Sequence, residues 1–113
     1  MRNASSIIEY FNTETKDGKI IDHHQWIEAA KMLAVLIGTE REKLFELQQS
    51  VAKIEYNLVA DGSTSAKASQ YSKTQDEWLQ MKKQESFVKQ IDDFIKIAKL
   101  HARIASEDAR NQL

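Results

Sequence analysis

The sequence predicts an all-α fold, in which a short N-terminal helix precedes a long antiparallel helical hairpin that assembles as a helical-bundle oligomer. Two observations support this prediction. The 113 residues contain no proline and only three glycines, so few positions interrupt a helix. Two long segments also carry apolar residues at seven-residue spacing, which is typical of helices that pack side by side in a coiled coil. At this length we expect a single domain, residues 1–113.

The first predicted element is a short helix over residues 6–12, within an N-terminal segment of residues 1–21. Ser6 and Glu9 have the spacing of a capping box, in which two side chains bond each other's backbone amides. A polar connector follows this helix, and Asp17-Gly18 marks a turn within it.

The first long helix is predicted over residues 22–61. Asp22 is a favourable N-cap with Gln25 at the capping-box position, and Asp61-Gly62 is the stop signal. The helix carries two heptad series, Ala30, Ile37, Leu44, Val51 and Leu58, and Trp26, Leu33, Glu40, Leu47 and Ile54. This phase continues through Gly38 and predicts one continuous helix, with a kink at Gly38 as the alternative.

Residues 62–73 are a predicted turn and lead-in, and the second long helix is predicted over residues 74–112. Thr74 lies three residues before Glu77, as an N-cap would, although a start near Ser65 is also open. This helix carries the series Met81, Val88, Ile95, Ala102 and Ala109, and the series Gln84, Ile91, Ala98 and Ala105. Two helices of similar length joined by a short connection are expected to lie antiparallel.

The long helices carry more apolar side chains than a single seam can bury. This surplus predicts self-association, most simply as a twofold dimer, and a compact three-helix monomer is the alternative. The predicted interface residues are Met32, Val35, Leu36, Phe87, Phe94, Ile97, Leu100 and Ile104.

Composition favours a soluble, cytoplasmic protein. The 16 basic and 17 acidic side chains give a net charge of −1, which does not favour non-specific binding to nucleic acid. The chain has no cysteine, which excludes disulfides and thiolate metal sites. Its longest apolar stretch, residues 29–37, contains Lys31 and is too short to span a bilayer, so no membrane partner is expected.

The sequence contains no recognisable catalytic constellation, and we expect no enzymatic activity, no cofactor and no metal. His24 and Glu28 lie one helical turn apart and make at most half a metal site. The hairpin register brings His101 near residue 27, but surface and interface histidines are the favoured interpretation. Three aromatic residues near helix starts are interpreted as packing anchors rather than as stacking platforms, namely Trp26, Tyr71 and Trp78.

A basic stripe runs along the second long helix at seven-residue intervals. It consists of Lys82, Lys89, Lys96, Arg103 and Arg110, with Lys99 beside it. One face of this kind could contact phosphates or single-stranded DNA. However, Glu85, Asp92 and Glu107 precede three of these cations by three or four residues. Intrahelical ion pairs that neutralise the face are therefore the favoured interpretation.

The segments DGSTSAKASQYSKTQDEW and VKQIDDFIKIAKLHARIASED resemble a group of small helical proteins that tailed bacteriophages encode in early or recombination gene regions. The resemblance covers roughly residues 55–108 and rests on an Asp-Gly turn, a small-residue stretch leading to an aromatic, and the FIKIAK helix. It implies a phage or prophage origin and transfers no catalytic residue. The predicted architecture is also similar to that of phage anti-defence proteins that sequester cyclic-nucleotide signals.

Three functions remain open at this point. The preferred one is a non-enzymatic homo-oligomer that inhibits, sequesters or adapts a host component, either a protein or a nucleotide signal. The second is an accessory protein that binds single-stranded DNA during phage recombination or replication. The third is a structural or scaffold component in which the hairpin acts as a spacer.

Overall fold

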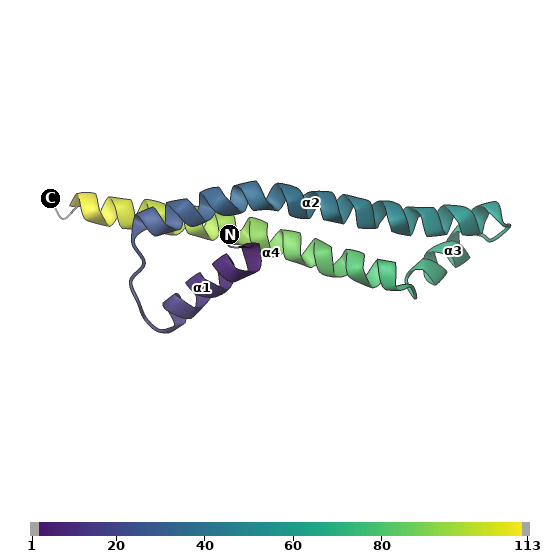
Figure 1. Ribbon diagram of the computed structural model, residues 1–113, viewed down its shortest axis with the longest axis horizontal. Coiled ribbons are helices and arrows are strands. Elements are labelled where there is room, and N and C mark those ends of the chain that lie inside the picture. The colour runs from purple at the N-terminus through teal and green to yellow at the C-terminus, as the bar shows by residue number, and fades with distance from the viewer. Residues whose placement is uncertain (1–2, 112–113) are drawn as a thin grey trace. The chain divides into compact units, whose positions relative to one another are not determined.

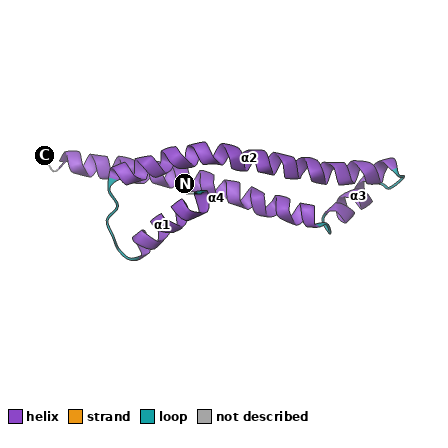
Figure 2. Cartoon of the chain, in the orientation of Figure 1, coloured by secondary structure: helices purple, strands orange, loops and turns teal. Residues whose placement is uncertain are grey.

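The computed structural model describes residues 3–111 and is 87% helical (Figure 1). Within these residues the helices are α1 (Ala4–Lys16), α2 (His23–Ala60), α3 (Ser65–Ser72) and α4 (Asp76–Asn111). The described residues contain no strand (Figure 2). These findings confirm the predicted all-α class and the pair of long helices. None of the described helices combines the length and apolar character needed to cross a membrane.

The helices build two compact units. Unit 1 contains the described residues up to Gly38 and from Lys89 onward, and it therefore includes α1, the first part of α2 and the last part of α4. Unit 2 contains Thr39–Val88, and it therefore includes the rest of α2, all of α3 and the first part of α4.

α1 begins two residues before the predicted position because Asn3, and not Ser6, is its N-cap. The side-chain oxygen of Asn3 accepts a hydrogen bond of 2.8 Å from the backbone N–H of Ser6. The Ser6 hydroxyl lies inside the first turn and donates to the Asn3 carbonyl at 2.9 Å. The predicted capping box between Ser6 and Glu9 is therefore wrong, because an asparagine three residues upstream already satisfies the free amide.

Both Asp-Gly pairs directly follow a helix. Asp61-Gly62 ends α2 as predicted, whereas α1 continues past its predicted end at residue 12 to Lys16, so Asp17-Gly18 stops this helix instead of forming a turn within a longer connector. Gly18 after α1 and Gly62 after α2 adopt positive φ values of 74° and 103°. The N–H of the residue that follows each glycine then bonds the carbonyl five residues earlier, at 3.0 Å in both cases. This is the Schellman motif, which places glycine where a Cβ is unfavourable.

α2 starts at its predicted cap. The backbone N–H of His24 donates to Asp22 Oδ1 at 3.4 Å, and the N–H of Asp22 donates to Gln25 Oε1 at 3.2 Å. These reciprocal bonds form a capping box with Asp22 in the N-cap position. From there α2 is one uninterrupted helix that passes through Gly38 and ends at Ala60.

Residues 65–72, predicted as a lead-in, form the separate helix α3. The hydroxyl oxygen of Thr64 caps it by accepting from the N–H of Lys67 at 3.2 Å. Ala68 and Ser72 are buried, and the Ser72 hydroxyl donates to Glu55 Oε1 on α2 at 2.7 Å. This contact joins residues that are 17 apart in sequence, so the local pattern could not show it.

α4 begins at Asp76, two residues after its predicted start. The Thr74 hydroxyl does not cap it, because that hydroxyl donates to the Tyr71 carbonyl at 2.7 Å. Asp76 and Glu77 lie in the first turn, where carboxylates interact favourably with the helix dipole. The predicted end of the helix at residue 112 lies outside the described residues.

The heptad series identify the packed side of both long helices, as predicted. Every described member, from Trp26 to Leu58 in α2 and from Met81 to Ala105 in α4, is buried or half-buried. The side chain of Ala109, the remaining member, lies outside the described residues.

Unit 1 has a core in which α1 packs on both long helices. Ile7, Ile8 and Phe11 of α1 are buried. The Phe11 ring centroid lies 4.7 Å from that of Trp26 on α2 and 5.9 Å from that of Phe94 on α4. The short helix therefore completes an aromatic cluster that the hairpin alone would leave open.

Unit 2 has a thinner seam between its helices. Within the described part of this unit only Val51, Ala68 and Ser72 are buried. A polar pair crosses the seam, since Gln84 Nε2 donates to Glu40 Oε2 at 2.7 Å and to the Glu40 carbonyl at 2.8 Å. The single charged residue of the heptad series is thus matched by an amide from the facing helix.

Candidate binding site

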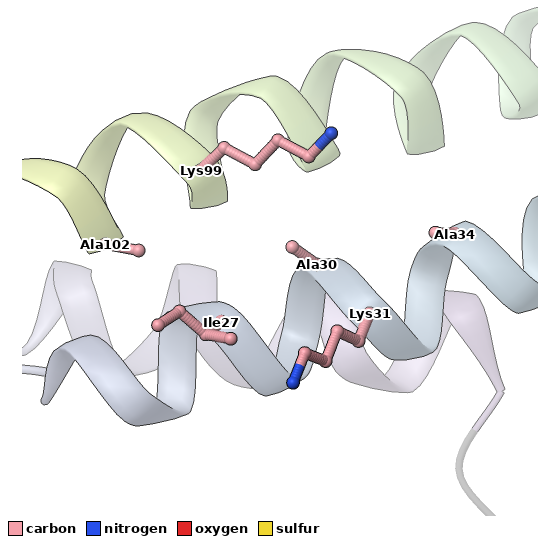
Figure 3. Close-up of a pocket in the computed structure, with 6 residues that line it drawn as sticks. All are labelled: Ile27, Ala30, Lys31, Ala34, Lys99 and Ala102. Atoms are coloured by element: carbon pink, nitrogen blue, oxygen red, sulfur yellow. The ribbon is translucent and has the colours of Figure 1, made fainter.

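An open groove lies between α2 and α4 in unit 1 (Figure 3). It encloses about 320 Å³ and is lined by Ile27, Ala30, Lys31, Ala34, Lys99 and Ala102. The alanine side chains point into the space between the two helices, whereas Lys31 extends along α2 and Lys99 along α4 (Figure 3). The groove therefore has an apolar floor of small side chains with an ammonium group along each helix.

The residues of this groove are suited to binding. Lys31 and Lys99 are the only titratable side chains that line it. Lys31 Nζ forms an ion pair with Glu28 Oε1 at 3.8 Å, whereas Lys99 makes no ion pair with any described residue. Apolar grooves of this kind hold apolar groups, and a few polar side chains at the edge orient them. The groove can accept an apolar group with an anionic substituent near Lys99.

α4 carries a second apolar face in unit 1, separate from its core face. Ile91 and Ala98 belong to the core face and are fully buried. Ile97, Leu100 and Ile104 are 47%, 44% and 44% exposed, and their spacing of three and four residues aligns them on one side of the helix. We call these three residues the α4 stripe.

The α4 stripe is the part of the predicted oligomer interface that the structure brings together on one exposed surface. Phe94, also predicted for that interface, is 7% exposed and lies in the core. Its ring centroid is 5.9 Å from that of Phe11 and 6.2 Å from that of Trp26. The assignment of Phe94 to the interface is corrected, because α1 covers this side chain within the same chain.

Three of the other predicted interface residues share one side of α2, and the fourth lies in unit 2. Met32 borders a crevice between α1 and α2, Val35 is exposed, and Leu36 is half-buried. Phe87 belongs to unit 2 and is half-buried there. None of these four residues lies on the same side of α4 as the α4 stripe.

The basic stripe is exposed along its whole length. Lys82 lies in unit 2, and the other five cations lie in unit 1. The predicted ion pair between Asp92 and Lys96 forms at 3.2 Å. Glu85, however, pairs with Lys82 at 3.7 Å instead of with Lys89.

Four cations of this stripe therefore make no ion pair with a described residue, namely Lys89, Lys99, Arg103 and Arg110. The interpretation of a self-neutralised face holds for only part of the stripe. Ion pairs with described residues do not neutralise these four cations.

Trp26 and His101 stack on each other in unit 1. Their ring centroids are 4.5 Å apart and their planes differ by 14°, which confirms that His101 approaches the region near residue 27. Trp26 is buried, in agreement with its interpretation as a packing anchor. Residues 3–111 present no group of three or more histidine and carboxylate side chains that could hold a metal ion.

Sequence reasoning missed an exposed apolar face on α2 in unit 2. This face consists of Phe45, Ala52, Tyr56 and Val59, and we call it the α2 face. Phe45, Ala52 and Val59 recur every seven residues, one position after a heptad series of the seam. A search for a second apolar repeat beside the first would have found it.

Comparisons with known proteins found no match to this chain among protein-family models, curated proteins or solved structures. The class defined by the fold is an all-helical protein built on a pair of long helices.

Proposed function

We propose that this chain is a non-catalytic binding protein that works as a homo-oligomer and holds a host component against exposed apolar helix faces. The observation that carries the proposal is the pair of apolar faces on α4 in unit 1. One face fills the core, and the three side chains of the α4 stripe are 44–47% exposed among the described residues.

The energetics favour a partner for such a stripe. Burying a Leu or Ile side chain stabilises a contact by about 1.5–3 kcal/mol relative to leaving it exposed. Three large side chains on one helix face offer several kcal/mol to a partner before the cost of ordering. Apolar surface that is concentrated in this way commonly marks an interaction site.

The nature of the host component is a proposal that rests on the sequence. The resemblance of residues 55–108 to small phage helical proteins favours a role in which a phage protein inhibits, sequesters or adapts part of the host. The partner is a host protein or a nucleotide signal. For a nucleotide, the groove offers an apolar surface beside Lys99, a cation that makes no ion pair with a described residue.

Native mass spectrometry of the purified chain, alone and with added nucleotides or short oligonucleotides, tests this proposal. We expect a mass of at least twice 13.0 kDa. A nucleotide retained by the oligomer would identify the class of partner, and a bare oligomer would direct attention to host proteins. A chain that stays at 13.0 kDa under all these conditions contradicts the homo-oligomer.

The unpaired cations of the basic stripe favour a second candidate, the binding of single-stranded DNA. Contacts to several phosphates would release counterions, so the affinity should fall steeply with salt, with a logarithmic slope of about −0.7 per contact. Fluorescence anisotropy with a labelled oligonucleotide measures this slope. Lys99→Glu with Arg103→Glu should abolish binding, whereas the exposed control Lys53→Glu should not.

A further inference from the structure

The α2 face is an exposed apolar surface that the proposed host-binding groove does not include. Phe45, Tyr56 and Val59 are 59%, 73% and 44% exposed, and Ala52 is exposed between them. They occupy positions i, i+7, i+11 and i+14, which lie on one side of a helix. This side differs from the seam side of α2, which carries Leu44, Val51 and Leu58.

Unit 2 buries little apolar surface by itself. Its seam residues Leu44, Leu47, Ile54 and Leu58 are only half-buried, and Val51 is the single large apolar side chain that is buried in this unit. A two-helix seam rarely offsets the conformational entropy of ordering its residues, which is about 1–2 kcal/mol for each residue backbone. A partner that covers the α2 face would therefore stabilise unit 2 as well as bind it.

The chemistry of the α2 face favours a second copy of the same chain. Its four residues are uncharged, and so are Gln48 and Gln49, which lie between Phe45 and Ala52 on the same side. These six positions therefore bring no like charges together in a pair of identical faces. The charged neighbours Glu46, Lys53 and Glu55 lie on the flanks of the face.

The spacing of the residues is also self-complementary. Phe45 and Val59 each lie seven residues from Ala52, and Gln48 and Tyr56 each lie four residues from it. In an antiparallel pair of α2 helices with its twofold axis at Ala52, Phe45 packs on Val59 of the second copy. The Tyr56 hydroxyl meets the Gln48 amide, and the two alanines allow the helices to approach closely.

We propose that a second copy of this chain packs antiparallel on the α2 face, with the twofold axis at Ala52. This inference deepens the proposed function and rests on its homo-oligomer, because it states where the second copy binds. It leaves the α4 stripe and the groove of unit 1 for the host component.

Cysteine cross-linking tests the pairing, because the native chain has no cysteine. We expect Ala52→Cys to form a disulfide-linked dimer under mild oxidation about tenfold faster than Asn57→Cys, because association holds the two introduced thiols together at the twofold axis. Asn57 is exposed on another side of the same helix. Gln48→Cys should also be slow, since eight residues at 1.5 Å place its two copies about 12 Å apart, beyond disulfide reach.

Two results overturn the inference while leaving the proposed function intact, provided that the native chain is oligomeric by mass. One is cross-linking of Ala52→Cys no faster than that of Asn57→Cys. The other is fast cross-linking of both Ala52→Cys and Gln48→Cys, which indicates a parallel pair. A native chain that is monomeric by mass removes the homo-oligomer of the proposed function together with this inference.

A pair of charge substitutions gives an independent readout. Ala52→Glu places two carboxylates at the twofold axis and should reduce the mass to 13.0 kDa, whereas Leu100→Glu should leave the oligomer intact. Circular dichroism confirms that both variants remain helical. The opposite result, with Leu100→Glu dissociating the oligomer and Ala52→Glu retaining it, places the second copy on the α4 stripe and overturns the inference.

Discussion

Phe11 explains why Phe94 is absent from the surface. Its ring lies between α1 and the two long helices and contacts both Trp26 and Phe94. Phe94 lies outside both heptad series of the second long helix, so the sequence predicted it on an exposed face. The spacing of apolar residues along one helix does not show which other element covers a given side chain.

Removing the Phe11 ring should loosen α1. We expect Phe11→Ala to lower the free energy of unfolding by on the order of 3 kcal/mol, because it leaves a cavity between three helices. Tryptophan emission, measured in a Trp78→Phe background so that only Trp26 reports, should shift to the red. The exposed substitution Glu9→Ala in the same helix serves as the control, and an equal effect of both substitutions would contradict this role of Phe11.

Gln84 satisfies the Glu40 carboxylate within the seam of unit 2. Gln84→Ala removes both hydrogen bonds to Glu40 and should cost about 1–3 kcal/mol, because the partly covered carboxylate loses a donor. Urea denaturation measures the change. Gln80→Ala, which removes only the exposed hydrogen bond to Asp76, should change stability by less than about 0.5 kcal/mol. Similar values for the two variants would refute the structural role of Gln84.

For single helices, sequence patterns predicted the caps and stops that depend only on neighbouring residues. The capping box at Asp22 and the glycine stop at Gly62 act within a few residues, and the structure confirms both. The separate helix α3 was not predicted, because the bond between Ser72 and Glu55 that anchors it is a tertiary contact. α1 begins earlier than predicted because Asn3, and not Ser6, is its N-cap.

Two glycines offer a matched test of helix continuity. A Cβ built at Gly38 or at Gly62 meets nothing within 4 Å, but only Gly62 has a positive φ. Gly38→Ala should therefore raise stability by about 0.5–1 kcal/mol, as for alanine within a straight helix. Gly62→Ala should lower it by about 1–2 kcal/mol because of its left-handed backbone. Thermal melts measure both, and a destabilising Gly38→Ala would indicate that α2 needs a bend there.

The two faces of α4 should respond differently to polar substitution. Leu100→Glu lies on the exposed stripe and should change the free energy of unfolding of the isolated chain by less than about 0.5 kcal/mol. Ile91→Asn places an amide in the core and should abolish cooperative unfolding. Far-UV circular dichroism during thermal melts distinguishes them. A strong loss of stability in Leu100→Glu would show that the stripe is already covered within the chain.

At the scale of the whole molecule, periodicity predicted an excess of apolar surface but only part of its location. The exposed α4 stripe was among the predicted interface residues. The α2 face was not predicted, because its residues lie one position after a heptad series of the seam and belong to neither series.

Sedimentation equilibrium of the native chain at micromolar concentration tests most directly whether this protein is a homo-oligomer held by exposed helix faces. We expect a mass of at least 26.0 kDa, twice the 13.0 kDa of one chain, and a shift to 13.0 kDa for Ala52→Glu. A native chain that sediments at 13.0 kDa across this concentration range would show that the protein is a monomer and that the proposed homo-oligomer is wrong.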